Sequence, residues 1–199
     1  MNAGTIIYLN GPSSAGKTRL AHALQRILDE PYFHLSTDDF AACVLRRADG
    51  GEAFDGDVIG PKLNRGFVRC IVALASSGLN VIVDDVLCES WRLDGKVDDE
   101  SGADLLNQRL AALAPYSVLY VGVFCSLDEL EQRERTRGDR SSGLARFQYN
   151  RVHAHSIYDV EVDTLLHTPE ECAAEVKAAL AHRRSPSAFE RMWQLAPQG

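Results

Sequence analysis

The sequence predicts an α/β fold with a mostly parallel, five-stranded sheet flanked by helices. Two observations support this prediction. Short apolar and β-branched runs, each the length of one buried strand, alternate along the 199 residues with amphipathic stretches of helical period. The first apolar run also leads directly into a glycine-rich loop and then a helix, as a βαβ unit begins. Since ligands bind at the carboxyl ends of parallel strands, we expect the functional site at that edge of the sheet.

The first strand and the loop after it carry the most specific pattern. Residues 5–10 (TIIYLN) read as a buried strand, and residues 11–18 (GPSSAGKT) fit G-x-x-x-x-G-K-[ST] at every fixed position. In this pattern glycines allow a tight turn, backbone N–H groups and a helix N-terminus face phosphate oxygens, and the lysine contacts the β- and γ-phosphates. The threonine hydroxyl is placed to ligate Mg²⁺. We therefore predict a site for a nucleoside triphosphate formed by Gly11, Pro12, Ser13, Ser14, Ala15, Gly16, Lys17 and Thr18.

The alternative for this loop is a glycine-rich turn without a ligand. The sequence context favours the phosphate loop, because the pattern begins at the end of an apolar strand. It then opens an amphipathic helix whose apolar positions are Leu20, Ala21, Leu24, Ile27 and Leu28.

Composition narrows the class of protein. Hydrophobic residues make up 45% and charged residues 25%, as in an ordinary globular domain. The formal net charge of −7 disfavours nucleic acid as a partner. The N-terminus lacks a signal-peptide pattern, no apolar run is long enough to cross a membrane, and the five cysteines form no CxxC pair. We expect a cytoplasmic protein without membrane contact, and the sequence leaves homo-oligomerisation open.

The remaining elements follow in order. Further strands are expected at residues 32–35, 80–85, 118–123 and 159–163. Helices are expected at residues 40–45, 61–77, 103–113, 126–137 and onward to about 155, and 169–182. The segments 48–60 and 88–103 are expected to be a loop and a charged surface excursion. We expect residues 1–182 to form the main domain and the tail, residues 183–199, to carry a short docked helix.

Several boundaries have specific signals. Thr37 or Asp38 is expected to cap the helix at 40–45, and Pro61 to open the next helix. Ser126-Leu127-Asp128-Glu129 has the form of a capping box, with Ser126 as N-cap.

Acidic residues follow the second and third strands. Asp38 is our candidate for the group that accepts the proton of an attacking hydroxyl, the alternative being a helix cap. Asp84, which ends an apolar strand, is a candidate for holding the metal, the alternative being a plain turn residue. Asp85 could share that role or bind substrate.

A basic run lies between the fourth strand and the last. It contains Arg133, Arg135, Arg137 and Arg140, and the same stretch holds Gly138-Asp139 and Ser141-Ser142-Gly143. A helix followed by such a loop suits an Arg-rich lid over a triphosphate, in which Arg137 and Arg140 would act on the transferring phosphoryl group and Arg133 would contact the nucleotide. The alternative is a solvated helix face, since Glu129, Glu131 and Glu134 could pair with these arginines.

Together these stretches resemble the chloramphenicol phosphotransferase family. The shared residues are Asn10-Gly11, Ser13 to Lys17, Asp38, Ile59-Gly60-Pro61, Val83 to Val86, Val121-Gly122-Val123, Arg137 to Arg140, Val152-His153 and Tyr158 to Thr164. The resemblance implies a P-loop kinase fold and ATP- and Mg²⁺-dependent phosphorylation of a small-molecule hydroxyl. It also implies that Asp38 is the base and that Arg137 and Arg140 belong to the lid.

This chain departs from that family where an acceptor would bind. Pro12 and Asp39 are unusual for the family, the segment 87–115 is longer, and the tail after Arg183 is additional. Three functions therefore stay open: a kinase of chloramphenicol or a related compound, a kinase of another metabolite or a nucleic-acid end, and a nucleotide-dependent switch or ATPase.

Overall fold

The alternating apolar runs form a five-stranded parallel sheet. The computed structural model describes residues 2–43, 56–87, 101–137, 143–154 and 157–195. Its strands are β1 (Ile6–Asn10), β2 (Tyr32–Ser36), β3 (Asn80–Asp85), β4 (Val118–Phe124) and β5 (Val160–Asp163). They lie in the order β2-β3-β1-β4-β5, and every neighbouring pair is parallel. The expected sheet is thus confirmed, with β1 at its centre.

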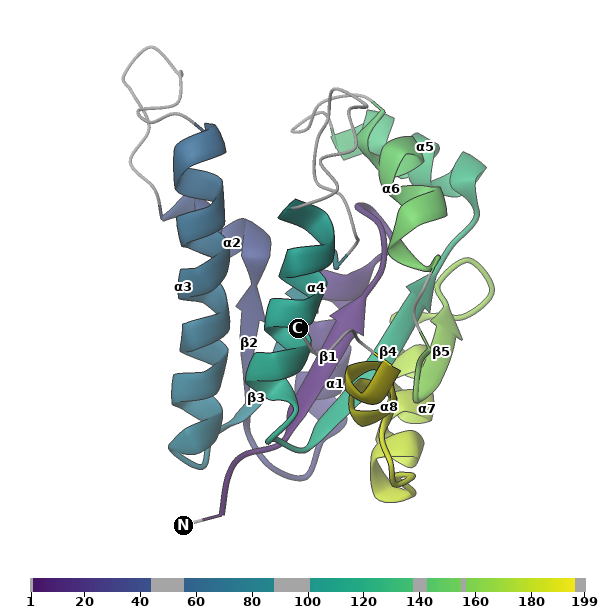
Figure 1. Cartoon of the computed structure of the whole chain (residues 1–199). Coiled ribbons are helices and arrows are strands. Elements are labelled where there is room, and N and C mark those ends of the chain that lie inside the picture. The colour runs from purple at the N-terminus through teal and green to yellow at the C-terminus, as the bar shows by residue number, and fades with distance from the viewer. Residues whose placement is uncertain (1, 44–55, 88–100, 138–142, 155–156, 196–199) are drawn as a thin grey trace.

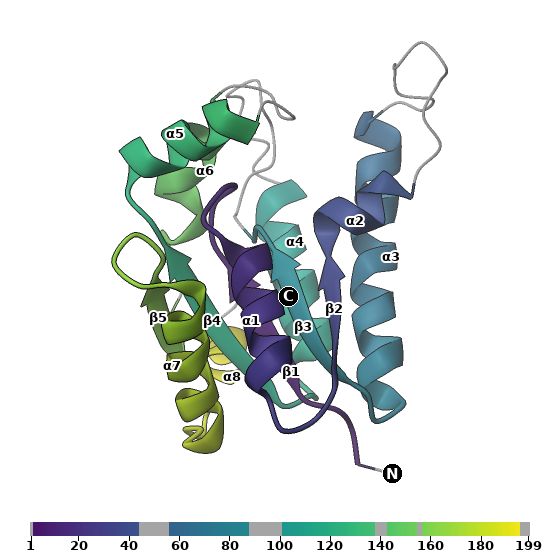
Figure 2. The same cartoon turned by 180° about the vertical axis from the view of Figure 1, so that it is seen from behind.

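The helices occupy both faces of the sheet and its carboxyl edge. They are α1 (Lys17–Ile27), α2 (Thr37–Ala42), α3 (Gly56–Ser76), α4 (Ser101–Leu113), α5 (Leu127–Arg137), α6 (Leu144–Val152), α7 (Pro169–Ala181) and α8 (Ala188–Leu195). Figure 1 shows α3, α4 and α8 on one face, and the reverse view shows α1 and α7 on the other (Figure 2). The pair α5 and α6 stands above the carboxyl ends of β1 and β4 (Figure 1).

Alternation along β1 divides the core in two, because successive side chains of a strand point to opposite faces. Ile7 and Leu9 join a cluster with the buried residues of α1 and α7. Ile6 and Tyr8 join a second cluster with residues of α3, α4 and α8. Both faces are therefore covered, as the apolar, non-alternating strands require.

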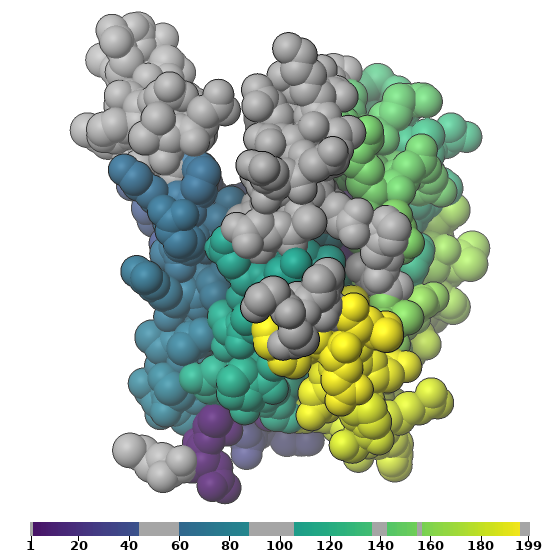
Figure 3. Space-filling model, in the orientation of Figure 1, coloured from purple at the N-terminus to yellow at the C-terminus, as the bar shows by residue number. Residues whose placement is uncertain are grey.

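The tail carries α8 at residues 188–195. Its Ala188, Phe189 and Met192 are buried in the second cluster. Figure 3 shows this yellow helix against the teal α4 on the outer surface. Among the described helices, none combines the length and hydropathy needed to cross a bilayer.

Two expected boundaries are wrong. The cap of α2 is Ser36, whose hydroxyl accepts from the N–H groups of Asp38 and Asp39; neither Thr37 nor Asp38 takes this role. Helix α3 begins at Gly56, so Pro61 lies inside it and does not open it, and residues 56–60 of the expected loop are helical. A proline in the second turn removes one backbone hydrogen bond, and the rest of the 21-residue helix can compensate for that loss.

Candidate active site

The phosphate loop joins β1 to α1 in the shape its glycines allow. Gly16 has φ 89°, in the left-handed region, and is the N-cap of α1. Gly11 is required for a different reason: a Cβ atom there would lie 2.4 Å from the carbonyl oxygen of Val123 on β4. Gly16 offers no side chain to cap α1, and a helix N-terminus without such a cap suits an anionic ligand.

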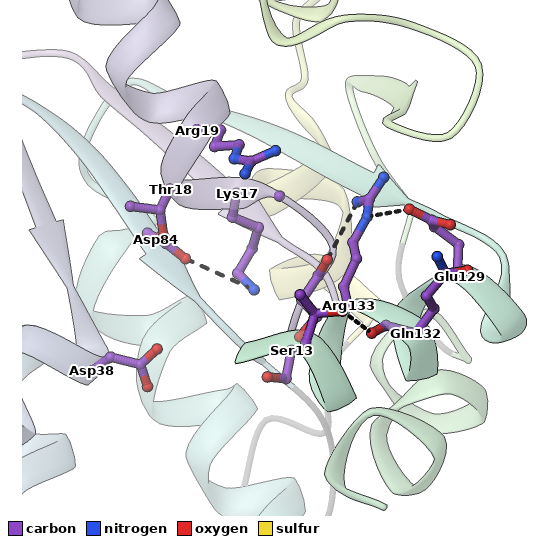
Figure 4. Close-up of a pocket in the computed structure, with 12 residues that line it drawn as sticks. Ser13, Lys17, Thr18, Arg19, Asp38, Asp84, Glu129, Gln132 and Arg133 are labelled. Atoms are coloured by element: carbon purple, nitrogen blue, oxygen red, sulfur yellow. Dashed lines mark hydrogen bonds and ion pairs between the residues drawn. The ribbon is translucent and has the colours of Figure 1, made fainter. Parts of the chain in front are cut away.

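Lys17 is the first residue of α1, and its side chain turns back into the curve of the phosphate loop. Its side chain is buried, and Nζ donates to the carbonyl oxygens of Gly11 at 3.0 Å and Pro12 at 3.1 Å. Nζ also lies 3.8 Å from Oδ1 of Asp84. In Figure 4, Asp38 and Asp84 lie on one side of Lys17, and Arg133 lies on the other. The ammonium group is thus held inside the curve of the loop, where phosphates would bind.

Thr18 and Asp84 lie together beside Lys17. The Thr18 hydroxyl donates to Oδ2 of Asp84 at 2.7 Å, and Nε2 of His34 lies 3.7 Å from the same oxygen. Burial alone would raise the pKa of Asp84, but the charge of Lys17, the nearby His34 ring and the hydrogen bond from Thr18 outweigh it and lower the pKa. Asp84 is therefore a carboxylate at neutral pH, next to the hydroxyl expected to bind metal.

Asp85 belongs to a different network, on the opposite side of β3. Its Oδ2 accepts from the Tyr8 hydroxyl and from Nε of Arg109 at 2.9 Å, and Nη2 of Arg109 lies 2.9 Å from the same oxygen as the ion-pair partner. Burial would lower the pKa of Arg109, but the charge of Asp85 and the contact with Tyr8 outweigh it and raise the pKa. Asp85 thus forms a buried ion pair with Arg109. It lies apart from Thr18 and Lys17, which contact Asp84 instead.

Two cavities meet at Asp38, which lies in the first turn of α2. The first has a volume of about 370 Å³ and is lined by Ser13, Ser14, Gly16, Lys17, Thr18, Arg19, Asp38, Asp84, Glu129, Gln132, Arg133 and Thr136 (Figure 4). The second has a volume of about 250 Å³ and is lined by Thr37, Asp38, Phe40, Ala41, Gly60, Leu63, Asn64, Phe67 and Asp85. Because Ser36 caps α2, the Asp38 side chain is not required for that purpose.

Arg133 braces the site from α5. Its guanidinium group contacts Glu129 at 2.7 Å, the Ser14 carbonyl at 3.4 Å, and the hydroxyl and carbonyl of Thr164 at 3.2 and 3.1 Å. Arg133 lines the first cavity while holding the end of β5 against the phosphate loop. Of the other lid candidates, Arg137 ends α5 with an undescribed side chain, and Arg140 lies outside the described residues.

Sequence reasoning missed Arg109, His34 and Thr164. Arg109 carried a signal, since a cation one turn before Leu113 and beside Leu110 interrupts an apolar helix face. His34 carried none, since it is one polar residue in a short strand, and Thr164 was quoted only as the end of the stretch that resembles the family. Thr164 contacts the loop only because β5 lies beside β4, with its hydroxyl 2.8 Å from the carbonyl oxygen of Ala15.

The sequence is similar to a family of phosphotransferases, in agreement with the phosphate loop described above. A family model described as chloramphenicol phosphotransferase-like protein matches residues 4–181. A protein of Mycobacterium tuberculosis strain H37Rv, named as an O-phosphotransferase, is 33% identical over 214 residues, covering 96% of this chain and 89% of that protein.

Solved structures show the same fold at low sequence identity. The APS kinase of Mycobacterium tuberculosis, in complex with AMPPNP and APS, has a TM-score of 0.62 and 18% identity, over 91% of this chain and 99% of that one. The tunicamycin resistance protein of Deinococcus radiodurans has a TM-score of 0.62 and 19% identity, over 89% of this chain and 95% of that one. The chain therefore has the P-loop kinase fold.

Proposed function

The chain belongs to the chloramphenicol phosphotransferase-like family, and from this premise we propose that it moves the γ-phosphoryl group of ATP to a hydroxyl group of a small, apolar molecule. Chloramphenicol or a related compound is the first candidate acceptor, with phosphorylation of its 3-hydroxyl and loss of antibiotic action as the result. Because ATP is a substrate, we place the reaction in the cytoplasm.

One observation carries the proposal: Asp38 lines both cavities. The first cavity contains the phosphate loop and Lys17, so it suits the triphosphate. The second is open to Asp38 from the side of α2 and α3, so it suits the acceptor. A carboxylate at the junction of the two can reach a hydroxyl group that approaches the γ-phosphoryl group.

The proposed step is an in-line displacement. The acceptor oxygen forms a bond to the γ-phosphorus, the bond from that phosphorus to the β,γ-bridging oxygen breaks, and ADP leaves. Asp38 accepts the hydroxyl proton. Lys17 offsets charge on the phosphate oxygens from inside the loop, and Arg137 and Arg140 are proposed to do so from the lid side.

The oxygen donors of Thr18 and Asp84 fit Mg²⁺. This ion binds proteins through few oxygen ligands and keeps waters and substrate phosphates for the rest, so one hydroxyl and one carboxylate are sufficient. When bound, Mg²⁺ neutralises charge on the β- and γ-phosphates. The described residues hold no cluster of three or more His, Cys, Asp or Glu side chains that could hold a metal by themselves.

The second cavity indicates the class of acceptor. Its large side chains are Phe40, Leu63 and Phe67, and the two aromatic rings contact each other with centroids 5.6 Å apart. Asn64 and Thr37 add hydrogen-bonding groups, and the described residues that line this cavity include no lysine or arginine. A neutral or cationic apolar alcohol fits such walls. A phosphorylated or sulfated acceptor, or a nucleic-acid end, would lack a positive charge to pair with.

Acceptor-dependent turnover tests the proposal. The protein is incubated with Mg²⁺-ATP and, separately, chloramphenicol, other aromatic alcohols, a sugar and adenylyl sulfate. ADP release and the mass of the acceptor are measured together. We expect a mass gain of one phosphate on an aromatic alcohol only, and none with Lys17→Ala. ADP release that no acceptor stimulates would favour a nucleotide-dependent switch, and phosphorylation of the anionic acceptor alone would contradict the assigned substrate class.

A further inference from the structure

The phosphate loop contains a residue in a costly backbone conformation. Ser14 has φ 66°, and it is the one non-glycine residue with positive φ in the described part of the chain. A side chain disfavours this left-handed region, so the surrounding structure must hold it there. The Ser14 hydroxyl does not explain the conformation, because its oxygen is buried without a hydrogen-bond partner among the described residues.

Two side chains hold the backbone on either side of Ser14. Before it, the N–H of Ser13 donates to Oε1 of Gln148 at 2.7 Å, and the Gln148 side chain is buried, with 2% of the residue exposed. After it, the carbonyl oxygen of Ser14 accepts from Nη1 of Arg133 at 3.4 Å. The bond that Gln148 accepts is the shorter of the two.

These two side chains come from two helices that are bonded to each other. Gln148 is on α6 and Arg133 on α5, and Glu134 of α5 ties the helices together. The Glu134 carboxylate accepts from the N–H of Gly143 at 2.9 Å and from that of Ala145 at 3.0 Å, where the N-cap Gly143 offers no side chain of its own. Moving α6 would therefore move the oxygen on which Ser13 depends.

We propose that Gln148 is a positioning residue for nucleotide binding, which takes the Ser13 N–H and thereby keeps Ser14 left-handed and the phosphate loop formed before ATP arrives. A preformed loop binds more tightly because no conformational ordering is needed on binding. The inference rests on the proposed function only in taking ATP as the ligand of the loop. A purely structural role is the competing explanation: Gln148 would then be a buried polar group that stabilises α6.

The variant Gln148→Met separates these explanations. Methionine nearly keeps the side-chain volume but is a poor hydrogen-bond acceptor, so it leaves the Ser13 N–H without its partner. We expect ATP, measured by titration calorimetry without acceptor, to bind about tenfold more weakly. The KM for an acceptor should stay within about twofold of the parent value, as the loss concerns the nucleotide. Asn150→Ala, an exposed position on the same helix, is the matched control and should bind ATP normally.

The decisive experiment repeats the change with glycine at position 14. Glycine adopts positive φ without penalty, so a loop carrying Ser14→Gly needs Gln148 less. We expect Gln148→Met to weaken ATP binding by less than about threefold in that background, a non-additive result. A structural role in α6 predicts an equal loss in both backgrounds, and that outcome, or normal ATP binding by Gln148→Met, would overturn the inference. If the parent protein bound no ATP, the proposed function would fail first, and the inference would fail with it.

Discussion

At the scale of single residues, β3 ends in two carboxylates with separate tasks. Asp84 points to the face that carries Thr18 and Lys17, and Asp85 points to the face that carries Arg109 and Tyr8. The alternation of a strand alone produces this division. Adjacent acids in the sequence therefore need not share a function.

We expect Asp84→Asn to impair mainly the use of Mg²⁺ and Asp85→Asn to impair mainly the stability of the fold. Asp84→Asn should raise the Mg²⁺ concentration needed for half-maximal turnover by about 10- to 100-fold. It should destabilise the fold less than Asp85→Asn does, because the buried Lys17 ammonium keeps the carbonyl oxygens of Gly11 and Pro12 as acceptors. Asp85→Asn should lower the free energy of unfolding by about 3–5 kcal/mol, since it leaves the buried Arg109 charge unpaired. Metal titration of activity and urea unfolding of both variants measure this. Equal stability of the two variants would contradict the division.

Asp38→Asn tests the proposed base. The variant keeps the shape of the side chain but cannot take a proton, so we expect phosphoryl transfer to fall by about 10²-fold or more while ATP affinity changes little. Asp39→Asn is the matched control, because Asp39 is the next residue on α2 and is exposed. If the control loses transfer and Asp38→Asn does not, the base is Asp39.

His153 should make stability depend on pH. Burial, and secondarily the charge of Lys17, lowers the pKa of this ring to about 4, while its Nδ1 lies 2.7 Å from the Tyr158 hydroxyl. Between pH 6.5 and pH 4 the unfolded chain binds a proton at this position and the folded chain does not, so stability falls as the pH falls.

Because the ring is partly exposed, we expect a loss of about 1–2 kcal/mol of unfolding free energy from this group between pH 7 and pH 4. Unfolding curves of the parent protein and of His153→Gln, recorded across that range, isolate the contribution. His182→Gln, at an exposed position, should follow the parent curve. Parallel curves for His153→Gln and the parent would show that the folded ring titrates normally.

At the scale of elements, the pair α5–α6 is tied together by one buried carboxylate, Glu134. It supplies acceptors for two N–H groups at the start of α6, a place where helices otherwise depend on a side-chain cap. Glu131 also joins the pair, through Arg146 at 2.6 Å, but that arginine is 65% exposed. Glu134 and Glu131 thus both join α5 to α6, the first through backbone N–H groups and the second through a solvent-exposed arginine.

We expect Glu134→Ala to destabilise the protein by about 1–3 kcal/mol and to open the start of α6 to proteases, because two N–H groups lose a charged acceptor. Glu131→Ala should cost no more than about 1 kcal/mol, as a solvated ion pair does. Urea unfolding and limited proteolysis of both variants measure the difference. A larger loss for Glu131→Ala would mean that the exposed pair holds the helices together.

How far the sequence predicts this molecule depends on the range of each interaction. The strands, the phosphate loop and the capping of α5 by Ser126 follow from local periodicity and spacing, and the structure confirms them. The predicted cap of α2 was wrong because Ser36, Thr37 and Asp38 are all residue types that favour the N-cap position. Only the path of the backbone decides which of them takes it. The Arg109–Asp85 pair spans 24 residues, and the Gln148–Ser13 bond spans 135, so neither has a local signature.

At the scale of the whole molecule, the tail completes the core on the face opposite α1. Phe189 of α8 packs against Tyr8 and Tyr120, with ring centroids 5.4 and 4.8 Å apart. Tyr8 also donates to Asp85, so the tail covers the network that lies behind the second cavity. Helix α8 of the tail therefore contributes buried side chains to the core.

We expect Phe189→Ala to lower the free energy of unfolding by about 3–5 kcal/mol, the usual cost of removing a buried aromatic ring. Leu195→Ala, at the end of the same helix and 80% exposed, should change it by less than about 0.5 kcal/mol. Thermal and urea unfolding provide the measurement. A small effect of Phe189→Ala would show that α8 is only loosely attached.

The central place of β1 has a consequence for motion. A strand paired on both sides and buried along its whole length exchanges its amide protons only when the entire domain opens. The phosphate loop begins at the last residue of that strand, so one of its two ends is anchored in the slowest-opening part of the protein. The second cavity is instead bounded by α2 and α3, beside the edge strand β2, where opening costs less. The nucleotide would thus bind against the part of the fold that opens most slowly, and the acceptor against helices that can move more easily.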